Sequence, residues 1–227
     1  MLGKTINKLL EIFNLRLTRL KRNENLVKDH TKDYFLKQQY LVKSEFKYIL
    51  WLDRIYQKIL NTPGHIVELG VAYGRNAIIF SNLAKMNGEE DLRKYIGFDT
   101  FNGYNKESLD KSDLESIWWS DNSKEKVIDR LKLAKVENNC ELIEGDIMNS
   151  LASYTIENPN LRIALLYVDC NAYEPAIKGM NHLKDYLSPG AVICIDEKVQ
   201  GGETKALIEF CEKNNLKFLK DSSSYSI

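Results

Sequence analysis

Carboxylates end two apolar runs in the second half of this 227-residue sequence. One run ends in Asp169, and the other ends in Asp196 followed by Glu197. If the runs are adjacent strands, the three acids meet at one edge of a sheet, where their repulsion costs free energy unless a cation or protons neutralise it. Mg²⁺ is a hard cation that prefers oxygen ligands, so the pattern predicts a magnesium site. The alternative is a protonated acid, or an ion pair with a lysine such as Lys198.

A turn with two glycines follows an earlier apolar run, in the segment VELGVAYGR. Gly70 and Gly74 let the backbone approach a ligand closely at the end of a strand. A dinucleotide-binding turn has the pattern GxGxxG, and its middle glycine is missing here. Glu68 stands where a buried strand would otherwise carry an apolar side chain, and its carboxylate fits the amino group of a methionine moiety. The turn, including Val71, therefore predicts a site for S-adenosylmethionine rather than NAD; a tight turn with a salt-bridged Glu68 is the alternative.

Two further acids follow strand-like runs and suit the rest of such a cofactor. Asp99 ends the run YIGFD, and its two oxygens fit the 2′,3′-diol of a ribose. Asp146 follows a glycine after the run ELIEG, where it can accept a hydrogen bond from the adenine amino group. The simpler interpretations are a helix N-cap or turn residue for Asp99 and a loop acid for Asp146.

Aromatic residues are the candidates for acceptor binding. Trp118 and Trp119 lie in a long polar connection, and a connection of that length in a compact domain is usually a functional lid or a disordered segment. Their rings, together with Tyr173, can stack on a sugar ring or a base. Alternatively, one tryptophan only anchors the connection to the core.

The elements that position these residues alternate between two periodicities. The expected strands are 66–69, 95–98, 141–143, 163–168 and 191–195, and the expected helices are 76–86, 124–134, 174–187 and 204–214. Such alternation predicts stacked βαβ units, hence an α/β, doubly wound, mostly parallel Rossmann-like sheet with helices on both faces. The segments 216–219 and 224–227 are expected to add one or two edge strands.

The first 60 residues differ from the rest because their apolar residues recur at helical spacing. We expect residues 1–61 to form a helical cap or dimerisation region and residues 62–227 to form the catalytic domain, which makes a homodimer the expected assembly. The basic side chains near the N-terminus allow a second interpretation, a helix that touches a membrane surface or an acidic partner.

Composition excludes several classes of protein. Lys plus Arg and Asp plus Glu both number 32, so the zero net charge argues against a nucleic-acid binder. Four cysteines without a CxxC pair indicate a reducing, cytoplasmic compartment. We find no apolar run of 18 residues and no signal peptide, so neither secretion nor a transmembrane segment is expected.

Taken together, three segments resemble one known family. VELGVAYGRN, YIGFDTFNGY and VDCNAYEPAIKGMNHLKDYLSPGAVICIDE, with the following GGET, are similar to the macrocin O-methyltransferase (TylF-type) family of class I methyltransferases. The resemblance covers about residues 62–215. It implies an S-adenosylmethionine-dependent enzyme, usually with a divalent metal, that methylates a sugar hydroxyl in natural-product or surface-polysaccharide biosynthesis. By position it implies a methionine-side pocket at Glu68, Gly70 and Gly74, a ribose ligand at Asp99, and metal ligands at Asp169, Asp196 and Glu197.

The sequence departs from the family pattern at two positions. The family commonly has an Asp, proposed as the base, where this sequence has Asn171, whose amide cannot usefully accept a proton. Asp169 or a metal-bound hydroxide then remains to take the proton from the acceptor hydroxyl. The other departure, Glu197 in place of Asp, affects only metal geometry. Three alternatives stay open: a phenolic or catechol O-methyltransferase, a non-catalytic S-adenosylmethionine-binding protein, and an NAD-dependent oxidoreductase.

Overall fold

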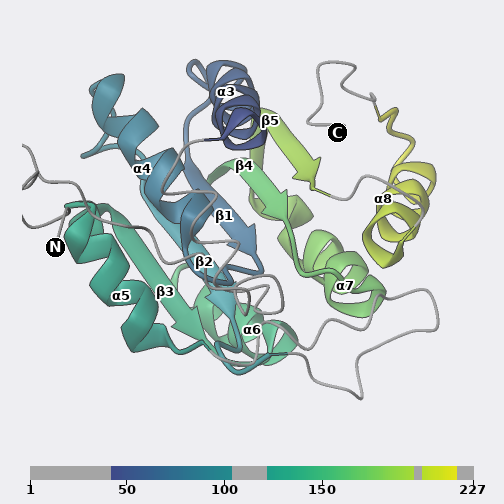
Figure 1. Cartoon of the computed structure of the whole chain (residues 1–227). Coiled ribbons are helices and arrows are strands. Elements are labelled where there is room, and N and C mark those ends of the chain that lie inside the picture. The colour runs from purple at the N-terminus through teal and green to yellow at the C-terminus, as the bar shows by residue number, and fades with distance from the viewer. Residues whose placement is uncertain (1–41, 104–121, 197–200, 219–227) are drawn as a thin grey trace, which may run out of the picture. The chain divides into compact units, whose positions relative to one another are not determined.

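The protein contains one five-stranded parallel sheet (Figure 1). The computed structural model describes residues 42–103, 122–196 and 201–218. The strands are β1 (His65–Leu69), β2 (Tyr95–Asp99), β3 (Cys140–Glu144), β4 (Ile163–Val168) and β5 (Leu187–Ile195), in the order β3-β2-β1-β4-β5. The expected doubly wound α/β sheet is therefore confirmed.

Helices cover both faces of this sheet (Figure 1). One face packs against α3 (Lys43–Gln57), α4 (Arg75–Met86) and α5 (Lys124–Leu133). The other packs against α6 (Ile147–Glu157), α7 (Tyr173–Leu183) and α8 (Gly202–Lys213). Two short 3₁₀ turns, η5 (Glu137–Asn139) and η6 (Lys184–Tyr186), precede β3 and β5.

The strands form where apolar residues run without interruption, because both faces of a parallel sheet are buried. All six residues of β4, IALLYV, are buried. In β1, Val67 and Leu69 enter the core shared with α6 and α7, whereas Ile66 enters the core shared with α3 and α4. Glu68 faces the second of these cores by alternation, which places a carboxyl group inside an apolar layer.

Three details of the expected secondary structure were wrong. Helix α6 was not predicted, although Asp146 caps it and Leu151 and Tyr154 line its buried side. Strand β5 begins at Leu187, where a helix was expected, because η6 ends the preceding helix. Residues 216–218 form no strand, while 219–227 lie outside the described residues.

Helix α3 shares its core with the sheet. The described residues from 42 onward belong to one compact unit, and the buried side of α3 includes Tyr48, Trp51 and Tyr56. The boundary after residue 61 stays a prediction, but this helix of the proposed N-terminal region lies against the catalytic fold. Among the described residues, no helix is long and apolar enough to cross a membrane.

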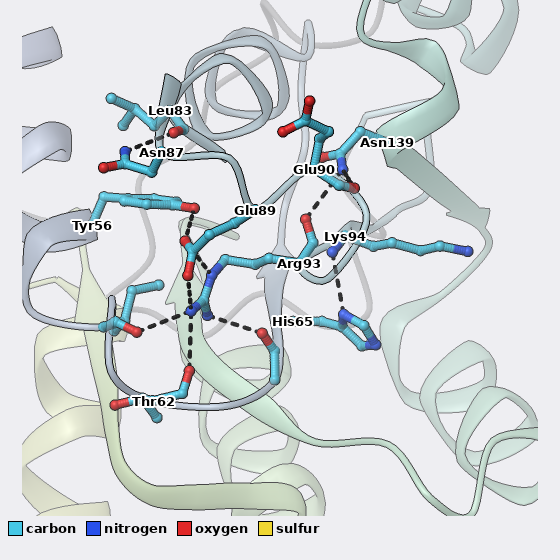
Figure 2. Close-up of polar contacts among 12 residues, drawn as sticks. Tyr56, Thr62, His65, Leu83, Asn87, Glu89, Glu90, Arg93, Lys94 and Asn139 are labelled. Carbon is cyan, nitrogen blue, oxygen red and sulfur yellow. Dashed lines mark hydrogen bonds and ion pairs between the residues drawn. The ribbon is translucent and has the colours of Figure 1, made fainter. Parts of the chain in front are cut away.

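A buried arginine ties α3 to the strands (Figure 2). Arg93 is 4% exposed, and its guanidinium donates to the carbonyl oxygens of Ile59, Thr62 and Gly64 at 2.9–3.0 Å. It also forms an ion pair with Glu89 at 3.1 Å. These contacts fix the connection from α3 to β1, at the amino ends of the strands and away from the carboxyl ends.

Candidate functional site

The carboxyl ends of all five strands meet along one edge, and backbone hydrogen bonds continue the ladder past the strands. Asp196 donates its N–H to Val168, and Asp169 donates to Leu69 at 2.8 Å. On the other side, Gly70 donates to Phe98 and Gly145 donates to Asp99, both at 2.9 Å. The chain runs from β1 to β2 on one side and later to β4 on the other, so the switch point lies between β1 and β4, where doubly wound sheets bind ligands.

The turn after β1 packs tightly against the end of β4. Gly70 has φ +93°, and a β-carbon there would collide with the Asp169 carbonyl group. Gly74, with φ +79°, begins α4, and a β-carbon there would lie 2.7 Å from the Val127 side chain. Glycine is thus required at both positions, which brings the backbone of this turn directly to the switch point.

Asp99 holds the same turn from the other side. Its Oδ2 accepts hydrogen bonds from Val71 N and Ala72 N at 2.7 and 2.8 Å. Its Oδ1 accepts from Phe101 N at 2.7 Å, so the carboxylate organises two loops. A dinucleotide-binding fold leaves such turn N–H groups for pyrophosphate. Here an acidic side chain takes two of them, which disfavours the NAD alternative, and a ribose contact has to share these oxygens.

Glu68 lies in a buried polar network below the turn. Its side chain is fully buried, and it accepts hydrogen bonds from Asn76 Nδ2 at 2.6 Å and from the Tyr95 hydroxyl. Tyr48 on α3 extends the network by donating to Asn76 Oδ1 at 2.8 Å, and its hydroxyl lies 3.2 Å from that of Tyr167. No sequence pattern indicated that Tyr48 or Asn76 belongs to this network.

Burial changes the charge expected for Glu68. Desolvation raises the pKa of its carboxyl group from 4.5 to about 8, although the bonds from Tyr95 and Asn76 act in the opposite direction. In this structure Glu68 supports the turn from below through Asn76 and Tyr95, and its contact with the cofactor amine stays a prediction.

Asp169 is the acid at the switch point. Burial raises the pKa of its carboxyl group well above the ordinary value, and the charges of Asp196 and Glu203 raise it further. The acids that follow β4 and β5 therefore interact, as the sequence predicted. Asn171 lies beside them, with Nδ2 3.4 Å from Asp169 Oδ1. Glu203, at the start of α8, was missed because an acid in a first helical turn normally faces solvent.

The remaining predicted residues divide into two groups. Asp146 caps α6 by accepting a hydrogen bond from Met148 N at 3.0 Å, and it also lines a groove of about 560 Å³ between β3 and α6. Tyr173 donates to Glu209 at 2.5 Å, and Lys205 lies over its ring, so this tyrosine joins α7 to α8. Trp118, Trp119 and Glu197 lie outside the described residues.

Metal binding has only partial support in the geometry. Within residues 42–103, 122–196 and 201–218, no group of three or more His, Cys, Asp and Glu side chains can hold an ion. Asp169 and Asp196 alone do not complete the predicted triad. The described part of the site therefore does not by itself fit the Mg²⁺ that the sequence predicted.

A parallel sheet with the order β3-β2-β1-β4-β5 is Rossmann-like, and the solved structures described next show that it is the class I methyltransferase fold. Residues 67–197 match the model of a family described as "Methyltransferase domain", and the chain belongs to that family. No curated protein sequence matches the chain. The expected enzyme class, an S-adenosylmethionine-dependent O-methyltransferase, is confirmed by the family match together with the similarity to the CalS11 structures described next.

Solved structures of similar fold include two of the calicheamicin methyltransferase CalS11. One has a TM-score of 0.64 and 25% identity, over 92% of this chain and 82% of that chain. The other, an apo structure described as a TDP-rhamnose 3′-O-methyltransferase, has a TM-score of 0.59 and 26% identity, over 91% and 82%. The O-methyltransferase NovP, at 18% identity and a TM-score of 0.63 over 74% and 72%, shows the fold alone.

Proposed function

We propose that this O-methyltransferase acts on a sugar hydroxyl, in a nucleotide sugar or a glycosylated metabolite. The observation that carries the proposal is the similarity to CalS11, which spans 92% of this chain and whose acceptor is named as TDP-rhamnose. The macrocin O-methyltransferase family, to which the sequence motifs are similar, implies the same acceptor class.

The crevice suits S-adenosylmethionine on chemical grounds. This cofactor carries a positive sulfonium and a positive amino group, and the switch point is lined by Asp169 and Asp196, whose charges interact. The turn from Gly70 to Gly74 would hold the methionine part through its backbone. Asp99 lies on the side where the ribose is expected, and Asp146 lies at the end of β3, where the adenine is expected.

When bound, the cofactor would supply the methyl group that the acceptor oxygen receives, and S-adenosylhomocysteine would be the product. The protein must hold that oxygen in line with the methyl group, and this alignment is its main contribution. Asp169 takes the hydroxyl proton, since it is a partly buried carboxylate at the switch point with a raised pKa. Asn171 lies beside it as a hydrogen-bond donor.

The experiment is a pair of measurements on the full chain. Calorimetric titration of S-adenosylhomocysteine tests the cofactor, in Mg²⁺ and in EDTA, and release of S-adenosylhomocysteine from S-adenosylmethionine with TDP-rhamnose tests the acceptor. We expect micromolar binding and turnover that Asp169→Asn lowers by about 10²-fold or more. The matched control is Asp185→Asn, which changes an exposed acid in η6. Loss of turnover in EDTA would support the predicted Mg²⁺ and Glu197 as a ligand.

Two other functions predict different results. A phenolic or catechol O-methyltransferase turns over catechol and not TDP-rhamnose. A non-catalytic binding protein, which the Asn171 departure allows, binds S-adenosylhomocysteine but turns over neither acceptor. The TylF-type assignment, the homodimer, the cytoplasmic location and the biosynthetic pathway stay predictions from the sequence.

A further inference from the structure

Glu203 in the first turn of α8 is a buried acidic side chain outside the segment that matches the family. It is 1% exposed, and the match ends at residue 197. The helix dipole stabilises an acid in a first helical turn even when that acid is exposed to water. The burial of Glu203 therefore has another cause.

That cause is the turn that follows β4. Glu203 Oε1 accepts a hydrogen bond from the backbone N–H of Asn171 at 2.6 Å. The neighbouring Cys170 thiol is also buried, and burial together with Glu203 raises its pKa. Glu203 thus contacts a turn that is 32 positions away in the sequence.

The bond to Asn171 fixes a strained conformation. Asn171 has φ +51°, in the left-handed region that residues other than glycine rarely adopt, although asparagine tolerates it better than most. In this conformation its side chain turns back, and Nδ2 lies 3.4 Å from Asp169 Oδ1. A chain of contacts therefore leads from Glu203 through Asn171 to the acid at the switch point.

The contact with Asn171 needs an acceptor oxygen and not a negative charge. A neutral amide at position 203 could accept the same hydrogen bond from the Asn171 N–H. What the turn requires from position 203 is therefore the acceptor oxygen at the correct reach.

We propose that Glu203 is a positioning residue of the methyl-transfer site. It holds Asn171 in the left-handed conformation, and the Asn171 amide then orients Asp169 toward the crevice. The inference rests on the proposed function for the role of Asp169, but the contact between Glu203 and Asn171 can be tested without it.

The test compares four single variants. Glu203→Ala removes the acceptor, Glu203→Asp shortens it by one methylene, Glu203→Gln keeps it without charge, and Asn171→Gly keeps the backbone N–H and the favourable φ but removes the amide. Amide hydrogen exchange at Asn171 and calorimetric titration of S-adenosylhomocysteine are measured on each. If Glu203→Ala does not fold, Glu203→Asp takes its place in the comparison, and its thermal unfolding shows that this variant is folded.

We expect Glu203→Ala and Glu203→Asp to speed exchange at Asn171 and weaken S-adenosylhomocysteine binding by about tenfold or more each, whereas Glu203→Gln stays within about threefold of wild type. In the double variant Asn171→Gly/Glu203→Ala, binding should be no weaker than in Asn171→Gly alone. The reason is that Glu203 acts on Asp169 only through the side-chain amide of Asn171, which is already missing there. A purely structural role would give additive losses instead.

Three results would overturn the proposal. They are unchanged exchange at Asn171 in Glu203→Ala, additive losses of affinity in the double variant, and equal losses in Glu203→Gln and Glu203→Ala, since the acceptor oxygen would then not be the active feature. If wild type does not bind S-adenosylhomocysteine, the proposed function fails, while exchange and a crystal structure of Glu203→Ala still decide the contact with Asn171.

Discussion

Replacing Glu68 by glutamine separates two roles for this residue. The sequence suggested a carboxylate that binds the cofactor amine, whereas the structure shows a fully buried carboxyl group between Asn76 and Tyr95. Glutamine has the same shape as the protonated acid: its oxygen accepts from Asn76, and its amide can donate to the Tyr95 hydroxyl. The variant therefore imitates the neutral form at every pH.

The expected effect on stability follows from the pKa. The folded pKa of Glu68 is about 8 and the ordinary value is 4.5, so the folded state binds more protons between these values. Its contribution to stability is thus complete below pH 4.5 and is lost as the pH rises toward 8. The slope is about 1.4 kcal/mol per pH unit, or about 4 kcal/mol between pH 5 and pH 8.5. Glu68→Gln lacks this loss.

The assay is urea unfolding of both proteins at several pH values from 5 to 8.5. Between pH 5 and pH 8.5, the free energy of unfolding of Glu68→Gln minus that of wild type should increase by about 4 kcal/mol. This change is equivalent to a difference in Tm of roughly 8–16 °C. All other titrating groups cancel in the difference. Glu157→Gln, which changes an exposed acid at the end of α6, is the control and should give a constant difference.

Two results refute this reasoning. Parallel stability profiles of wild type and Glu68→Gln would show that Glu68 does not change its proton binding on folding. A loss of S-adenosylhomocysteine affinity of about tenfold or more at pH 7 would show that an ionised Glu68 meets the cofactor amine, as the sequence suggested. We expect the affinity to stay within about threefold of wild type.

The remaining variants test the supports of the site. Arg93→Ala should lower the free energy of unfolding, measured in urea, by about 3–5 kcal/mol, because three carbonyl groups and Glu89 lose a buried partner. The affinity for S-adenosylhomocysteine should not change, and Lys94→Ala, at an exposed neighbour, is the control. Asp99→Ala should weaken S-adenosylhomocysteine binding by about tenfold or more in calorimetry, because the turn after β1 loses two anchors, and unchanged affinity would count against this role. Asp146→Ala should lower the free energy of unfolding in urea by about 1 kcal/mol, because α6 loses its N-terminal cap. A fall in the affinity for S-adenosylhomocysteine of more than about twofold would support the predicted contact between Asp146 and the adenine.

The order of strands and helices was largely predictable because parallel strands are buried on both faces. Runs such as IALLYV at 163–168 have no other stable place in a chain of this composition. One exception is the start of β5: the strand was expected from residue 191, yet Pro189 and Gly190 also lie within it, at exposed positions that tolerate them. Helix α6 was missed because its cap, Asp146, was interpreted as a ligand or as a loop acid and not as a helix cap.

The site was predictable where chemistry follows directly from a strand end. Asp99, Asp169 and Asp196 were found because parallel strands bring their carboxyl ends to one edge. The partners of these acids were not predictable, since Tyr48, Asn76 and Glu203 contact the site from helices far away in the chain. Their types and spacing are ordinary for helix surfaces, and only packing shows that they are buried.

The sequence by itself determined the class of fold, the glycine turn and the acids that end the strands, because periodicity and strand direction are local properties. Tertiary structure decided the electrical state of these acids. Burial makes Glu68 a largely neutral support of the turn, and the proximity of Asp196 and Glu203 raises the pKa of Asp169. Desolvation and the distances between charges depend on what packs around a group, and residues far apart in the chain supply that packing.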